Sequence, residues 1–216
     1  MDFSFTADQR LFQDAVRDLL ANECLPDEVR AAWESDGPGR SDARWVALAE
    51  MGVLGLTTPE AFGGLGMDEL DLVLLLEEAG RVCLPEPLVE TVAVAAPLLA
   101  DLSAGSSGAA AAEWLPKIVA GDGVVTVGFE RDVYVSEGAT AELLLLERDG
   151  ELHAVPWADA AVVSQRSVDR ARRIARVEWT PTPDTLLASG DEAATALAAA
   201  LDRGVLGVSA MLLGVT

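Results

Sequence analysis

The side chains that most often do chemistry in proteins are scarce in this chain and form no catalytic pattern. His153 is the only histidine, so neither a histidine-based triad nor a histidine-rich zinc site can form. We expect His153 on the surface of a strand. Cys24 and Cys83 are the only cysteines, lack metal-binding spacing and favour a reducing compartment. No catalytic residue can therefore be assigned from these types and spacings.

Charge narrows the possible ligands. The formal net charge of −21 excludes nucleic acid as a partner, because phosphate binding needs a basic surface. One local exception is a cluster of arginines, which we call the arginine cluster: Arg166, Arg170, Arg172, Arg173 and Arg176. Two interpretations of it stay open. It either binds an anionic ligand or forms a solvated strand-and-turn face.

Composition places the chain among globular proteins. Hydrophobic residues make up 50% of its 216 residues, enough to bury a core in one large or two small domains. The apolar run 72–76 is far too short to cross a membrane. The first five residues have neither the basic nor the apolar region of a signal peptide. We therefore expect a cytoplasmic protein that does not contact a membrane.

Helical signals dominate the first half of the chain. Thr6 and Gln9 form a capping box, in which each side chain satisfies a free backbone N–H at a helix start. The residues after it predict one buried helix face: Leu11, Phe12, Ala15, Val16, Leu19 and Leu20. Ser41 predicts the start of a second helix that turns Trp45, Leu48 and Ala49 inward and stops at Gly52.

A glycine-rich loop at 59–66 precedes the next predicted helix, which closes on Gly80. Its glycines allow positive φ, so the loop is either a plain helix connector or a place where a ligand or another chain approaches the backbone. Further helices are predicted over about 88–102, ending in a Ser/Gly-rich stretch at 103–108, and from Ala109 to Gly121. The carboxylates of Glu77, Glu78 and Glu86 lie near helix ends, where we expect them to be solvated or capping.

The pattern changes near residue 121. Segment 124–129 is apolar, rich in β-branched residues and bounded by glycine, which predicts a strand. Further strands are predicted over 142–147, 152–155, 161–165 and 173–179. A hairpin turn is predicted at 148–151 and a proline-rich linker at 180–183. From Asp191 onward, helical spacing returns. The chain is thus predicted to be α+β, with a helical bundle over 1–121, a small antiparallel β-domain over 122–183 and a long helix over 184–216.

Several segments resemble one enzyme family. The loop 59–66, followed by a helix that ends Glu-Glu-Ala-Gly-Arg at 77–81, resembles the N-terminal helical domain of the acyl-CoA dehydrogenases. Segment 114–121 is similar to the stretch that leads into the family's middle β-domain. Residues 191–216 resemble the first helix of its C-terminal domain, which in the family supplies the catalytic glutamate and partner-subunit flavin contacts. The resemblance therefore implies FAD and an acyl-CoA substrate.

The resemblance also suggests cofactor-binding residues. Phe129, Glu130 and Arg131 stand where the family has Thr-Glu-Pro, so only Glu130 is retained. Tyr134 and Ser136 match an aromatic and a hydroxyl residue that touch the flavin in the family. We name Phe129, Glu130, Tyr134 and Ser136 as candidate flavin contacts. For Tyr134 and Ser136, the alternative is a half-buried strand end.

The family reaction removes an α-proton from the thioester and transfers hydride from the β-carbon to FAD. Two functions follow from the resemblance. The chain is either an oxidoreductase of this kind, as a homo-oligomer or one subunit of a heteromer, or a non-catalytic partner that stabilises or regulates an active subunit. Only three residues separate Glu130 from Tyr134, where the family has a long strand excursion. No base is assigned, because in the family it comes from the C-terminal domain, of which only the first helix is matched here. The eroded flavin loop is similar to that of actinobacterial heteromeric enzymes, which are the expected relatives.

Overall fold

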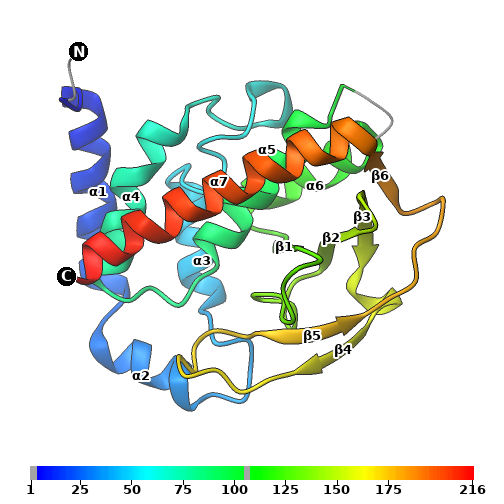
Figure 1. The fold of residues 1–216 in the computed structure, drawn as a ribbon. Coiled ribbons are helices and arrows are strands. Elements are labelled where there is room, and N and C mark those ends of the chain that lie inside the picture. The colour runs from blue at the N-terminus through cyan, green and yellow to red at the C-terminus, as the bar shows by residue number, and fades with distance from the viewer. Residues whose placement is uncertain (1–3, 105–107) are drawn as a thin grey trace.

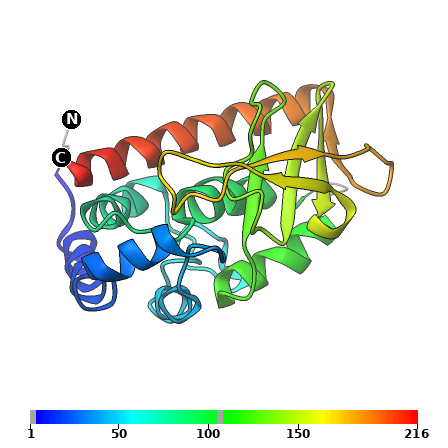
Figure 2. The same ribbon diagram turned by 90° about the horizontal axis from the view of Figure 1, so that it is seen from below.

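A computed structural model describes residues 4–104 and 108–216, and it confirms the predicted α+β class. Helices occupy most of the chain before residue 121, and strands follow (Figure 1). The last helix, α7 (Gly190–Val215), runs back across the helical half (Figure 2). The division into three domains at residues 121 and 183 stays a prediction.

Local capping signals placed two helix starts correctly. The helices before the strands are α1 (Ala7–Glu23), α2 (Pro26–Glu34), α3 (Asp42–Glu50), α4 (Glu69–Arg81), α5 (Ala96–Asp101) and α6 (Gly108–Ala120). Thr6 and Gln9 form the capping box of α1, and Ser41 accepts the N–H of Arg44 at the start of α3. Helix α2, which begins with Pro26 at its first turn, was not predicted. The Ser/Gly-rich stretch expected after α5 lies partly outside the described residues.

The buried face of α1 differs from the predicted one. Val16 and Leu20 are buried as expected, but Leu11 is 70% exposed and Ala15 is exposed as well. Gln13 is buried instead, because its amide donates a hydrogen bond of 2.8 Å to the carboxylate of Glu78 on α4. The buried face of α1 is therefore set partly by a polar contact with another helix.

The glycine-rich loop at 59–66 is a folded connector. It contains the short 3-10 helix η1 (Glu60–Phe62), and Gly63 and Gly66 have positive φ. Its backbone bonds to the segment just before it, with the N–H of Leu65 donating to the oxygen of Gly55 and that of Gly66 to the oxygen of Thr58. A Cβ on Gly64 would overlap Thr58, so this glycine is required for close packing within the chain.

Gly80 lies inside α4 and does not end it, which corrects the predicted helix end. The helix continues to Arg81, and a Cβ on Gly80 would overlap the carbonyl oxygen of Met211 on α7. In the same way, a Cβ on Gly214 of α7 would overlap the carbonyl oxygen of Glu77 on α4. The two glycines thus allow the backbones of α4 and α7 to touch.

The segment 88–102, predicted as one helix, consists of two helices of different type. Leu88–Ala95 forms a π-helix, η2, which continues directly into α5. Pro97 in the first turn of α5 has no N–H to donate and crowds the carbonyl of Ala93. A wider turn before the proline relieves this crowding, and such π segments often occur at functional sites.

The main sheet has strand order β1–β2–β3–β6. Its strands are β1 (Val125–Gly128), β2 (Leu143–Arg148), β3 (Glu151–Pro156) and β6 (Leu186–Ser189), while β4 (Ala161–Ser164) and β5 (Ala175–Glu178) form a separate pair. The 3-10 turn η3 (Trp157–Asp159) joins β3 to β4. The sheet is mixed, since β1 and β2 are parallel whereas the prediction made all strands antiparallel. The reason is that residues 129–142 cross back to the start of β2 instead of turning in a hairpin. Strand β6 was not predicted.

Helix α7 is long and apolar enough, by length and composition alone, to cross a membrane. Its most apolar 18-residue window has a mean hydropathy of 1.6, and 22% of that window is buried. The same helix packs on α4 through Gly80 and Gly214 and pairs Arg203 with Glu69 and Asp101. These contacts make it part of the helical layer of the fold, and the expectation of no membrane contact stays a prediction.

Candidate functional site

An apolar cavity of about 450 Å³ lies where three elements meet. One wall comes from η2, a second from the end of β1 and the crossover that follows it, and a third from α7. Its lining includes Val89, Glu90, Phe129, Tyr134, Ser136 and Val205. A largely apolar hollow with a few inward polar groups is the usual form of a small-molecule site.

The cavity contains three of the four residues predicted to bind a cofactor. Phe129, Tyr134 and Ser136 line it together, because the crossover from β1 to β2 passes over its mouth. Tyr134 is 48% exposed at the opening. Glu130 does not line this cavity, since its carboxylate accepts the N–H of Asp149 and its own N–H donates to Glu147. Whether these residues contact a flavin stays a prediction.

Ser136 is held by two hydrogen bonds at the cavity wall. Its hydroxyl donates to Oε1 of Glu90 at 2.9 Å, and its carbonyl oxygen accepts the hydroxyl of Thr126 at 2.7 Å. Glu90 comes from the π-wound segment η2, where it is the one acidic residue in an apolar run. Sequence reasoning missed Glu90, although a single carboxylate among Leu, Val and Ala was a visible signal.

A second carboxyl lies behind Ser136 and is almost completely buried. Glu137 accepts hydrogen bonds from the backbone N–H of Arg173 and the hydroxyl of Thr140, at 3.2 and 3.0 Å. Burial, followed by the nearby negative charge of Glu90, raises the pKa of Glu137 to about 7. Burial beside the negative charge of Glu90 therefore favours the protonated form of Glu137.

This raised pKa predicts how stability changes with pH. The folded state favours the protonated form of Glu137, so its contribution is present at low pH and is lost as pH rises from about 4.5 through about 7. The difference amounts to about 3 kcal/mol. About 2 kcal/mol of this loss falls between pH 5.5 and pH 8.5. We expect urea unfolding at these two pH values to show that Glu137→Gln removes most of it. Equal pH dependence in the variant and the wild type would contradict the assignment.

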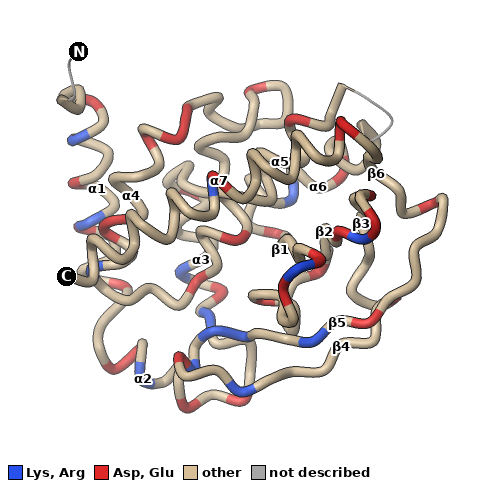
Figure 3. Tube along the Cα trace, viewed as in Figure 1, with Lys and Arg blue, Asp and Glu red and all other residues tan. Residues whose placement is uncertain are grey.

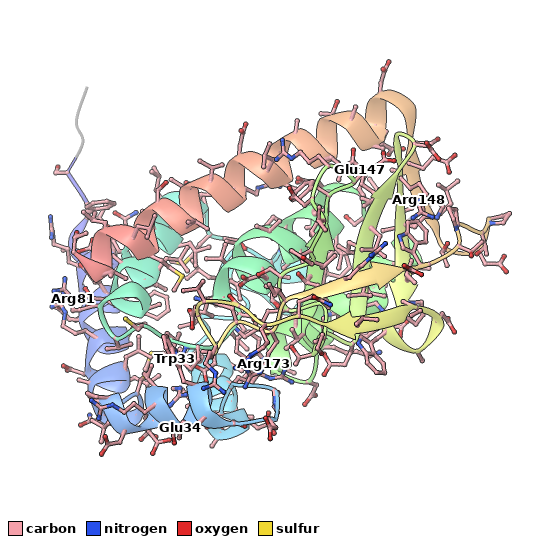
Figure 4. The ribbon with its side chains drawn as sticks, turned by 60° about the horizontal axis from the view of Figure 1, so that its bottom comes forward. Trp33, Glu34, Arg81, Glu147, Arg148 and Arg173 are labelled. Carbon is pink, nitrogen blue, oxygen red and sulfur yellow. The ribbon has the colours of Figure 1, made fainter. Side chains whose placement is uncertain are left out.

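One member of the arginine cluster, Arg173, joins distant parts of the chain. Arg173 donates to the carbonyl oxygens of Ala32, Ser35 and Gly37 at the end of α2, as its position beside Trp33 and Glu34 in Figure 4 illustrates. Figure 3 shows the basic stretch of chain between α2 and β5. Arg173 is therefore a structural link between α2 and the segment before β5, a role that neither predicted interpretation included.

The remaining arginines differ in exposure. Arg172 lies 3.6 Å from Asp169 and 3.9 Å from Glu90, and Arg176 pairs with Glu178. Arg166 and Arg170 are exposed and line a separate hollow of about 220 Å³ beside Trp33. The choice between an anion site and a solvated face stays open for these two.

Three polar residues are more buried than predicted. His153 is 2% exposed and bonds to Thr185 and Glu151, because its position in β3 pairs with Leu146 on the inner side of the sheet. Glu78 is held by Gln13, Arg17 and Arg81. Glu86 is fully buried and held by Arg44 and Ser41. These groups stabilise the fold, and none of them faces the cavity.

No metal centre accompanies the cavity. Across residues 4–104 and 108–216, no three His, Cys, Asp or Glu side chains gather closely enough to hold a metal ion. Cys24 is buried and Cys83 exposed, and both are free thiols.

Comparisons with known proteins agree on one family. Residues 6–122 match the family model "Acyl-CoA dehydrogenase, N-terminal domain". The chain is 29% identical over 197 residues to the acyl-CoA dehydrogenase IpdE2 of Mycobacterium tuberculosis, and 31% identical over 195 residues to IpdE2 of Mycolicibacterium smegmatis. These alignments cover 89% and 90% of this chain but only 58% of either relative.

Solved structures show the same fold. A variant of the Tcur3481–Tcur3483 steroid ACAD superposes with a TM-score of 0.80 at 24% identity, covering 96% of this chain and 63% of that one. The ChsE4–ChsE5 complex from Mycobacterium tuberculosis gives 0.78 at 21% identity, covering 96% and 65%. At these identities the likeness establishes the fold alone, and this chain matches about two thirds of each neighbour.

Proposed function

The chain belongs to the acyl-CoA dehydrogenase family, and we propose that it is one subunit of an enzyme that desaturates an acyl-CoA thioester with FAD as the hydride acceptor. The observation that carries this proposal is the cavity between η2, the crossover after β1 and α7. It brings together Tyr134 and Ser136, which match two flavin contacts of the family by type and spacing, and Phe129, which stands where the family has threonine.

The residues present fit part of a flavin. Phe129 and Tyr134 offer ring surfaces on which a planar aromatic group can pack, and Ser136 offers a hydroxyl. The apolar remainder of the cavity excludes water from an acyl chain. FAD would supply the redox chemistry, while this chain's residues bind and orient the groups that react. The base that removes the α-proton is not assigned to any residue of this chain.

A partner subunit would complete the cavity. On α7, Val205, Val208, Leu212 and Val215 are exposed and recur at helical spacing. Val205 and Val208 also line the cavity, so a chain packed on this stripe would close its open side. Leu197, earlier in the same helix, is buried against the fold and is not part of this stripe. The structural neighbours include the ChsE4–ChsE5 complex and the Tcur3481–Tcur3483 steroid ACAD, each named after two chains, which favours a related subunit as that partner.

One observation favours the non-catalytic alternative. The Ser136 hydroxyl donates its proton to Glu90, so the group expected to bond a flavin is already engaged by a carboxylate. In a non-catalytic chain that packs on an active subunit, Ser136 would not need to bond a flavin, so its hydrogen bond to Glu90 would have no functional cost.

The experiment that separates the two is purification of the tagged chain with its natural partners from its own cells. We expect flavin in the assembly and reduction of a dye acceptor that depends on acyl-CoA. The catalytic proposal is wrong if the partner alone keeps full flavin content and full activity after this chain is removed.

A serine substitution tests the flavin contact directly. In that assembly, Ser136→Ala should weaken flavin binding about fivefold, because one hydrogen bond is worth on the order of 1 kcal/mol. Ser103→Ala is the matched control, since the Ser103 hydroxyl bonds to its own helix at Ala100, away from the cavity. Unchanged flavin content in Ser136→Ala would leave Tyr134 and Ser136 as ordinary strand-end residues.

A further inference from the structure

Two exposed arginines, Arg166 and Arg170, differ from the other arginines of the chain. In the part of the chain that the structure describes, every other arginine side chain contacts a carboxylate, a backbone carbonyl or an aromatic ring. The side chains of Arg166 and Arg170 have no such contact, although the net charge of −21 means that carboxylates are plentiful. These two cations are therefore available to an anion from outside the chain.

Both side chains line the hollow of about 220 Å³, which we call the arginine hollow. One wall is the end of α2 with Trp33, and the other is the loop 165–174 between β4 and β5. Arg172 and Arg173 also line it, while Asp36 is the one acidic residue among the lining residues. The hollow is therefore locally positive, even though the whole chain is strongly acidic.

The loop 165–174 is fixed against α2, so the arginine hollow exists before any ligand arrives. Arg173 bonds to carbonyl oxygens at the end of α2, beside Trp33 in Figure 4. The N–H of Gln165 donates to the oxygen of Ile174 at 2.9 Å and closes the base of the loop. A Cβ on Gly39 would lie 2.8 Å from the carbonyl oxygen of Ala171, so the two walls also touch through their backbones. A preformed site loses little conformational freedom on binding.

Trp33 adds an aromatic surface to this positive hollow. Its side chain is 41% exposed and lines the hollow. An exposed indole stacks with the flat ring of a base, and arginine binds phosphate oxygens through parallel N–H groups. The hollow is smaller than the about 300–1,000 Å³ of ordinary small-molecule pockets, so it would enclose the phosphates and part of the ring of one small ligand. A nucleotide combines these two chemical features.

We propose that the arginine hollow is a second ligand site, which binds a free nucleotide with its phosphates on Arg166 and Arg170 and its base against Trp33. The apolar cavity and the arginine hollow share none of their described lining residues. The turn 136–139 contributes Ser136 to the cavity and Ala139 to the hollow. The proposal concerns a different site from that of the proposed function and does not depend on it.

Calorimetric titration of the whole purified protein with ADP, adenosine and inorganic phosphate tests the proposal. ADP carries both the phosphates and the ring, so it should bind about 10-fold or more tightly than either fragment. Arg166→Gln and Arg170→Gln should each weaken ADP binding about 10-fold, because each removes a charge-assisted hydrogen bond. Trp33→Ala should weaken it by a similar factor, and Trp33→Phe, which keeps a ring, should restore most of the loss.

Three further variants separate binding from folding. Arg30→Gln removes an exposed arginine on the same helix, paired with Asp27, and should bind ADP like the wild type. Trp157→Ala removes a tryptophan of similar exposure on η3 and should do the same. Asp36→Asn removes the negative charge from the hollow and should tighten ADP binding about two- to fivefold. Misfolding cannot produce such a gain.

Three outcomes overturn the proposal. Absence of ADP binding to the wild type returns Arg166 and Arg170 to a solvated face. Inorganic phosphate that binds as tightly as ADP indicates an anion site without a base contact. Displacement of ADP by an acyl-CoA or by FAD assigns the arginines to the site already proposed. Failure of the proposed function is distinguishable, since it appears as absent flavin or absent dye reduction and leaves the ADP titration unchanged.

Discussion

Glu86→Gln should lower the free energy of unfolding by about 3–5 kcal/mol, because it leaves the guanidinium of Arg44 buried without its counter-charge. The two side chains are 0% and 4% exposed. They form two parallel hydrogen bonds, from Nε to Oε2 at 2.9 Å and from Nη2 to Oε1 at 2.8 Å. Glu86 also accepts the N–H of Ser41, so one residue connects the start of α3 to the segment before η2.

Urea unfolding at neutral pH measures this effect. The matched control is Asp27→Asn, which breaks the pair between Asp27 and Arg30 on the surface of α2. Exposed ion pairs contribute little, so this variant should stay within about 0.5 kcal/mol of the wild type. A loss below about 1 kcal/mol in Glu86→Gln would mean that the pair is solvated after all.

Gly80→Ala should cost about 2 kcal/mol even though alanine is the better helix former. The new methyl group would overlap the carbonyl oxygen of Met211, so α4 and α7 must move apart along their contact. Overpacking of this kind costs about 1–3 kcal/mol, and the gain in helix propensity of about 1 kcal/mol offsets only part of a large clash. Limited proteolysis of α7 provides a second measurement, since a displaced helix is cut faster.

Gly204→Ala is the control within α7 itself. A Cβ at Gly204 would lie 3.5 Å from the nearest atom of Val94, which is an ordinary contact. This variant should therefore keep or slightly raise stability through helix propensity. If Gly80→Ala and Gly204→Ala behave alike, the two helices do not touch as described.

Local signals in the sequence predicted the elements that local interactions decide. The starts of α1 and α3 are set by hydrogen bonds between residues three apart in the sequence, at Thr6 with Gln9 and at Ser41. The predicted hairpin turn is formed by Asp149 and Gly150, which both have positive φ. The burial of Glu78 and Glu86 could not be read this way. Their partners Arg17 and Arg44 lie 61 and 42 residues away, so neither pair exists as a pattern in the sequence.

The candidate site shows the same limit. Phe129, Tyr134 and Ser136 were found because their segments resemble segments of a known family, and the structure brings all three to one cavity. Glu90 was missed because its role depends on Ser136, which lies 46 residues further along the chain. Glu90 also lies in a π-helix, whose wider turns do not follow the 3.6-residue spacing by which a helix face is recognised in a sequence.

The contact between α4 and α7 has a consequence for the newly made protein. Arg203 meets Glu69 across 134 residues, and the same helix covers the apolar side of α4 around Gly80. At about 5–20 residues per second, a ribosome needs roughly 7 to 27 seconds to make that intervening stretch. For this interval α4 has no α7 to cover it. We therefore expect chaperones to bind the nascent chain chiefly at α4 and η2, and to leave once α7 has emerged.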